Sequence, residues 1–145
     1  MEIEPGESES ELTVNGLIHQ DESGHHYLRS HVNLELRSAS HELFVSSRLT
    51  EPDQVFVRAE GGDTTPLTTF PIGSKWLGCP HGFCSWAIEW GVEFPDELLR
   101  SNLDGYSVRG HTASGTEVEI SITRGQIWSQ LAAADSLLVW GRKTP

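Results

Sequence analysis

The sequence is short of cysteine, of long apolar runs and of basic side chains. Its 145 residues include only two cysteines, too few for a disulfide scaffold or for a zinc site built from four thiolates. No segment approaches the roughly 20 consecutive apolar residues of a membrane-spanning helix, so we expect no membrane segment. The acidic start of the chain lacks an apolar stretch, so we expect no signal peptide and a cytoplasmic protein.

Basic residues are scarce relative to acidic ones. Lysine and arginine number 10 against 21 aspartates and glutamates, which gives a formal net charge of -11. Residues 1–22 alone contain seven acids and no lysine or arginine. Such a chain repels phosphate backbones, so we expect no nucleic-acid partner. Residues 1–10 predict a flexible acidic tail, which leaves residues 11–145 as a single domain.

Apolar and polar residues alternate along much of the chain, which predicts antiparallel strands joined by tight turns. In the first hairpin, a three-residue loop at residues 22–24 would place Ile18 opposite Leu28 and Val14 opposite Val32. The hydrophobic residues then share one face, as a half-buried hairpin requires.

A second hairpin is expected near the C-terminus. A loop of the same length at residues 113–115 would pair Tyr106 with Ile122 and Val108 with Ile120. The opposite face would then carry pairs of unlike charge, which favour the same register.

Further strands are expected between these hairpins. They fall at residues 41–50, 54–59 and 83–94, with a short strand at residues 65–70. A tight turn at residues 38–41 would place Leu36 opposite Leu43. Residues 60–82 contain several glycines and prolines and are expected to form one long irregular stretch.

The end of the chain changes to helical spacing. Thr123 and Gln126 fit a capping box, and Ile127, Leu131 and Ala134 follow on one helical face. We expect a helix of three to four turns there. About seven or eight short strands and one late helix predict an all-β fold, an antiparallel β-sandwich with a C-terminal α-helix. The absence of crossover helices excludes a parallel α/β fold.

The most suggestive local motif contains Cys79, His81 and Cys84. Two thiolates and an imidazole are three of the four ligands that zinc takes, so this motif is a candidate metal site. The same cysteines alternatively form a disulfide or remain two unreactive thiols. A redox motif is disfavoured, because no helix follows Cys79 to lower the pKa of its thiol.

Histidines gather around the first hairpin turn, where His19, Gln20, Asp21, His25 and His26 are close in sequence. Imidazoles beside a carboxylate bind a metal or fix a base in one tautomer. The alternative is an ordinary solvated turn, because a turn projects outward and offers no concave wall.

Motifs of established enzyme classes are absent. The chain has no Gly-x-Ser-x-Gly nucleophile motif and no glycine-rich phosphate loop followed by lysine. Glu89 and Glu93 lie roughly 13 Å apart along one strand face, too far for a paired general acid and base. No catalytic residue is therefore predicted, and a non-enzymatic role is favoured.

The favoured function is an accessory module that binds a protein partner, as a monomer or weak homodimer. Its binding surface would be the 61–82 loop with an adjoining sheet edge, and its contact residues Lys75, Trp76, Leu77 and Phe83. Trp76 has two alternatives: it stacks on a sugar, as in a carbohydrate-binding module, or it covers one end of the fold. A small metal-binding or thiol protein is the remaining alternative.

Overall fold

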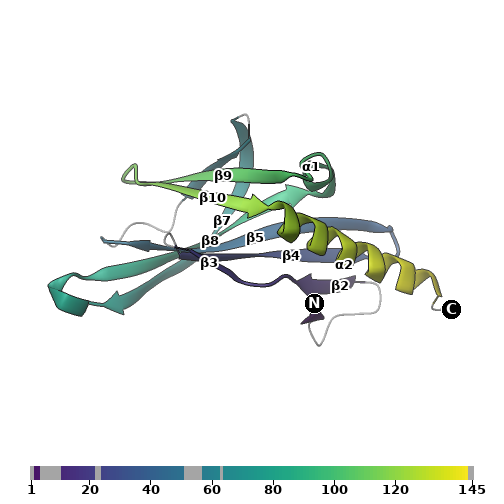
Figure 1. The fold of residues 1–145 in the computed structure, drawn as a ribbon, viewed down its shortest axis with the longest axis horizontal. Coiled ribbons are helices and arrows are strands. Elements are labelled where there is room, and N and C mark those ends of the chain that lie inside the picture. Colours follow the sequence, from purple (N-terminus) through teal and green to yellow (C-terminus); the bar gives the residue numbers. More distant parts are fainter. Residues whose placement is uncertain (1, 4–10, 22–23, 51–56, 63, 144–145) are drawn as a thin grey trace.

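The computed structural model describes residues 2–3, 11–21, 24–50, 57–62 and 64–143. Figure 1 shows strands gathered in one twisted sheet with a long helix lying along it. The strands are β1 (Glu2–Ile3), β2 (Glu11–Asn15), β3 (His19–Asp21), β4 (Gly24–Asn33), β5 (Ser38–Leu49), β6 (Val57–Gly61), β7 (Thr65–Gly78), β8 (Ser85–Pro95), β9 (Gly105–Thr112) and β10 (Glu117–Thr123). The helices are α1 (Asp96–Arg100) and α2 (Arg124–Lys143), and η1 (Pro80–Gly82) is a 3-10 turn.

The sheet is continuous and curled, which corrects the predicted sandwich. Its strands follow the antiparallel order β1-β2-β4-β5-β8-β7-β6-β9-β10, and β3 pairs with β4 beside this path. The long strand β7 joins the two halves, because Thr65–Leu67 pair with β6 while Thr68–Gly78 pair with β8. The fold is therefore mostly β, a half-barrel with a C-terminal helix, and not two sheets packed face to face.

Most of residues 60–82 belong to strands, so the prediction of a long irregular stretch is wrong. Pro71 lies in β7 beside a bulge, where the register against β8 shifts between Pro71 and Gly73. Among the described strands only β8 flanks β7 at this point. A strand tolerates proline where one side is unpaired or a bulge interrupts the ladder, so the prolines did not end the strand.

The core lies inside the curl, where α2 packs against β2, β4, β9 and β10 (Figure 1). Ile127 and Ala134 are fully buried on the helix face that meets the sheet. The main apolar cluster includes Leu28, Leu43, Val45, Ile88, Trp90, Val92, Phe94, Leu99, Val108, Ile122, Ile127 and Leu131. Because α2 contacts strands near both ends of the sheet path, it holds the two ends of the curl together.

The register of the second hairpin is confirmed. Tyr106 lies opposite Ile122 and Val108 opposite Ile120, around the expected loop at residues 113–115. The positive φ of Gly115, 92°, is the left-handed conformation that such a loop needs. Turn chemistry and hydrophobic pattern agree here, so the sequence determines the pairing.

The predicted register of the first hairpin is wrong by one residue in β3 and by two in β2. Near the turn Asp21 pairs with Gly24, at the end of the predicted three-residue loop, which shifts the ladder by one residue. Residues 16–18 then leave the ladder between the two strands, and this excursion adds the second. Leu12 therefore pairs with Val32, and Ile18 is exposed.

The turn between β4 and β5 lies at residues 34–37, not at residues 38–41. The side-chain oxygen of Asn33 accepts a hydrogen bond from the Leu36 amide at 3.0 Å, and Arg37 has a φ of 51°. Leu36 is consequently 76% exposed, while Leu28 takes the place opposite Leu43. The local asparagine bond decides the turn, which hydrophobic matching alone misplaces.

The capping box at the start of α2 is confirmed. The Gln126 amide donates to the Thr123 hydroxyl at 3.1 Å, and the Thr123 amide donates to Gln126 Oε1 at 3.0 Å. The helix runs for 20 residues, longer than the three to four turns expected. The strand expected at residues 54–59 is represented by β6 from Val57, since residues 51–56 lie outside the described ranges.

Candidate functional site

The end of the β7–β8 hairpin projects from the sheet and carries the predicted contact residues. We call residues 75–84 the hairpin tip. Trp76 lies opposite Trp86 near its base, and η1 forms its outer end (Figure 1). The positive φ of Gly78, His81 and Gly82 lets the chain reverse within these few residues.

A disulfide joins Cys79 to Cys84 and closes the hairpin tip. The sequence left open whether these cysteines bind a metal, form a disulfide or stay as thiols, and the structure shows the disulfide. The sulfur atoms are joined, so in this state neither offers a thiolate to zinc beside His81. Across the described part of the chain no group of three or more histidine, cysteine or acidic side chains is arranged to hold a metal ion.

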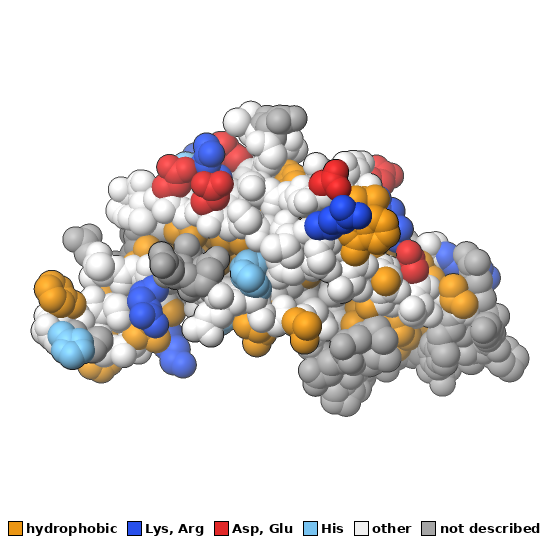
Figure 2. All heavy atoms as spheres, in the orientation of Figure 1, with side chains coloured by type: hydrophobic (Ala, Val, Ile, Leu, Met, Phe, Trp, Pro, Cys, Tyr) orange, Lys and Arg blue, Asp and Glu red, His pale blue; other side chains and the backbone are white. Residues whose placement is uncertain are grey.

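The hairpin tip exposes apolar side chains. Phe83 is 79% exposed, Trp76 63% and Leu77 40%. Trp76 is therefore not a cover over the end of the fold. Lys75 is also exposed and is the one formally charged side chain of the tip. Figure 2 shows apolar and basic side chains at this end of a molecule that is acidic overall.

The predicted histidine cluster is divided between two faces of the sheet. His19 lies opposite His26, with ring centroids 5.1 Å apart. His26 is buried, and its Nε2 lies 3.3 Å from Gln126 Oε1. His25 points to the other face, and Gly24 rather than His25 lies opposite Asp21. The structure thus brings two of the three histidines together on one face and separates them from His25.

Sequence reasoning missed a buried serine–histidine–aspartate chain. Ser30 and His41 are partners in the β4–β5 register, and Ser30 Oγ lies 2.7 Å from His41 Nδ1. His41 Nε2 lies 2.7 Å from a carboxylate oxygen of Asp96 at the start of α1. Gln130 of α2 donates to Ser30 Oγ at 2.9 Å, which ties both helices to the sheet. His41 has the same strand parity as the buried Leu43 and Val45, so the alternation of β5 is the sequence signal that could have placed it in the core.

The titration behaviour of this chain follows from its surroundings. Burial lowers the pKa of His41 and outweighs the opposing effect of Asp96, so the imidazole is neutral. In its neutral form the His41 ring donates a hydrogen bond from Nε2 to Asp96 and accepts one at Nδ1 from the Ser30 hydroxyl. Burial alone would raise the pKa of Asp96, but hydrogen bonds from Arg100 and His41 lower it. Arg100 continues the chain to Asp135 of α2 at 2.7 Å.

Ser30, His41 and Asp96 are hydrogen-bonded in the order of a hydrolase triad, but they do not lie at an accessible site. Ser30 and His41 are 0% and 1% exposed, so no substrate reaches the hydroxyl. The hydroxyl already accepts a hydrogen bond from Gln130, which occupies the space that an attacked carbonyl would need. The arrangement therefore locks β4, β5, α1 and α2 together and supports no acyl transfer.

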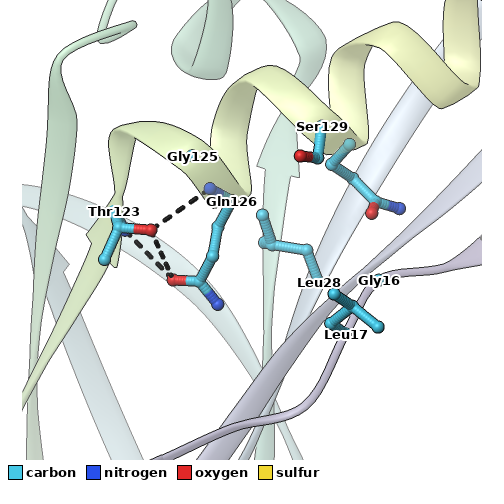
Figure 3. Close-up of a pocket in the computed structure, with 8 residues that line it drawn as sticks. Gly16, Leu17, Leu28, Thr123, Gly125, Gln126 and Ser129 are labelled. Carbon is cyan, nitrogen blue, oxygen red and sulfur yellow. Dashed lines mark hydrogen bonds between the residues drawn. The ribbon is translucent and has the colours of Figure 1, made fainter.

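A hollow of about 250 Å³ lies between the first turns of α2 and residues 16–17 (Figure 3). Leu17 and Leu28 form one side, and Gln126 and Ser129 form the other. Gln126 Oε1 already accepts from Thr123, as the dashed lines show. The lining contains no charged group, so the hollow offers no side chain that would neutralise the charge of an ionised ligand.

Comparisons of the chain with protein-family models, with curated proteins and with solved structures found no match. Neither helix of the described ranges is long and apolar enough to cross a lipid bilayer. Function is therefore argued from the geometry of the chain itself, beginning with the hairpin tip, where three exposed apolar side chains lie on one disulfide-closed segment.

Proposed function

We propose that this protein is a non-enzymatic interaction module that binds a protein partner through the hairpin tip. The observation that carries the proposal is the joint exposure of Trp76, Leu77 and Phe83 on a disulfide-closed hairpin. Aromatic side chains on rigid supports are the usual anchors of protein interfaces. The disulfide holds these anchors in place before binding and so reduces the entropy lost on association.

The chemistry of the hairpin tip specifies the partner's surface. Trp76 and Phe83 require an apolar groove, and Lys75 favours a carboxylate at its rim. Beyond Leu67 only β8 pairs with β7 among the described strands. The side of β7 that faces away from β8 is the sheet edge of the proposal. Its backbone groups are the ones with which a partner strand would pair.

A protein partner fits the tip better than a carbohydrate. Sugar sites combine an aromatic platform with amide or carboxylate side chains that hydrogen-bond to hydroxyl groups. Residues 73–85 contain no aspartate, glutamate, asparagine or glutamine. Within these residues Trp76 therefore has no carboxylate or amide side chain beside it to orient a sugar ring.

The location of the protein bears on the state of the hairpin tip. Disulfides persist in oxidising compartments, whereas most cytosols keep cysteine thiols reduced. A cytoplasmic location stays a prediction, and in that compartment Cys79 and Cys84 would be reduced thiols. Binding through the tip would then depend on the redox state of its surroundings.

Affinity capture with matched variants tests the proposal. The immobilised wild-type protein and the double variant Trp76→Ala/Phe83→Ala are exposed to the same extract and crosslinked. The control Leu36→Ala/Val139→Ala removes two exposed apolar side chains far from the tip in sequence. We expect one protein to be retained by wild type and control and lost from the tip variant. Equal retention by all three chains would contradict a role for the tip.

A further inference from the structure

A second hollow lies on the sheet face that turns away from α2. Its volume is about 340 Å³, at the lower end of the roughly 300–1,000 Å³ of small-molecule sites. We call it the outer pocket. Its lining residues are His25, Tyr27, Phe44, Val45, Ser46, Ile72 and Glu89. They come from β4, β5, β7 and β8, so rigid strands hold most of the wall.

Aromatic rings form one wall of the outer pocket. Tyr27 and Phe44 are cross-strand partners whose rings stack with centroids 5.1 Å apart and planes 13° from parallel. Phe70 meets Phe44 edge-on at 5.7 Å, and its ring occupies the place where a side chain at Gly91 would be. Neighbouring rings therefore hold Phe44 in place and leave the wall prearranged.

The carboxylate of Glu89 also lines the outer pocket. Glu89 is partly buried and pairs across the ladder with Ser46. Among the residues that the structure describes, its carboxylate has no ion pair and no side-chain hydrogen bond. Its negative charge is therefore available to a cation that enters the outer pocket.

The bulge in β7 shapes the remaining side. Gly73 takes the position opposite Glu89, and no atom lies within 4 Å of where its Cβ would be. Ile72, the extra residue of the bulge, lines the pocket instead. Bulges re-aim side chains in this way near binding sites, and here the bulge leaves the approach to Glu89 open beside an apolar contact.

We propose that the outer pocket binds an alkylated ammonium group. Glu89 neutralises the charge of such a group, which is spread over its methyl carbons, and the rings of Tyr27 and Phe44 that line the pocket contact those carbons. Ile72 supplies further apolar contact for the alkyl substituents. The Arg29 guanidinium lies 5.9 Å from the Phe44 ring centroid, so a bound cation shares this ring with it. This inference does not depend on the role of the hairpin tip.

The group has two sources with one chemistry, a free amine such as choline and a methylated lysine in a peptide. Titration of the full chain, monitored by protein-observed NMR, uses both choline and the N-acetyl amide of trimethyl-lysine. The neutral isostere of choline, 3,3-dimethyl-1-butanol, has the same shape without the charge. We expect both cations to shift the amide signals of residues lining the outer pocket, and the more tightly bound one identifies the source.

Two variants locate the interaction. Glu89→Gln should weaken cation binding about tenfold or more while leaving the fold intact. Glu93→Gln is the matched control, because Glu93 lies exposed on the same strand face and lines a different hollow. Equal binding of the neutral isostere, equal loss in the two variants, or signal changes away from the outer pocket would each overturn the proposal.

Discussion

At the scale of single residues, position in the register decides what a side chain does. His31 and His41 lie in the neighbouring strands β4 and β5. The structure buries His41 against Ser30 and Asp96, whereas His31 stays partly exposed and contacts Glu42. The difference follows from strand alternation, because Ser30 and not His31 lies opposite His41 in the register.

The buried position of His41 predicts a dependence of stability on pH. The unfolded chain binds a proton on this histidine below about pH 6.5, whereas the folded chain, with its lowered pKa, does not. The free energy of unfolding therefore falls as the pH drops below that value toward the folded pKa. Asp96, whose pKa is lowered in the fold, adds a further loss at about pH 4 and below.

Urea unfolding at several pH values between about 7.5 and 5 measures this effect. We expect His41→Gln to flatten the dependence by up to about 1.4 kcal/mol per pH unit, the limit for one proton. His111→Gln makes the same change in β9, at a partly exposed side chain, and is the matched control variant. Identical slopes for wild type and His41→Gln would show that burial of His41 does not govern the pH response.

At the scale of elements, the two hairpins show what a sequence pattern can and cannot supply. The β9–β10 pairing was predictable because the turn contains glycine where a positive φ is needed. The β2–β4 pairing was not, because nothing in the pattern marks residues 16–18 as outside the ladder. The sequence singled out Trp76, Leu77 and Phe83 as candidate contact residues without deciding whether Trp76 covers the end of the fold. The outer pocket was not, since it depends on the β4–β5 register and on the bulge in β7.

The disulfide should stabilise the hairpin tip more than the whole fold. A loop of this length contributes about 2 kcal/mol in the chain-entropy model, and the tip makes its contacts mainly within the β7–β8 hairpin. In the variant Cys79→Ser/Cys84→Ser we expect the amides of Gly78 and Ser85 to exchange with solvent at least tenfold faster. The global unfolding midpoint should change little.

Hydrogen exchange followed by NMR measures this prediction residue by residue. Reduction of the wild-type disulfide should reproduce the behaviour of the double variant. If the amides at the base of the tip keep their protection, the β7–β8 pairing alone holds the tip, and the bridge is not what orders it.

At the scale of the whole molecule, the sheet depends on α2 for its curvature. The sequence predicted strands and a late helix but divided the strands between two sheets. The division failed because β7 pairs with β8 and with β6 along its length, a connection that the prolines and glycines of residues 60–82 concealed. One face of one sheet therefore needs a cover, and α2 is that cover.

Removal of a buried side chain from α2 tests this dependence. Ile127 is fully buried against the main apolar cluster, and Ile127→Ala should lower the free energy of unfolding by about 2–5 kcal/mol. Val139→Ala on the exposed side of the same helix should change it by less than about 0.5 kcal/mol. Urea denaturation of the two variants gives the comparison. A small effect at Ile127 would mean that the sheet keeps its shape without close packing of the helix.

The position of α2 in the chain has a consequence for biosynthesis. The ten strands of the described ranges precede α2, so they leave the ribosome before the segment that shields their apolar side. A nascent chain that has emerged only as far as β10 presents Leu28, Val108 and Ile122 to the surrounding water. During that interval the chain exposes apolar surface of the kind that molecular chaperones bind.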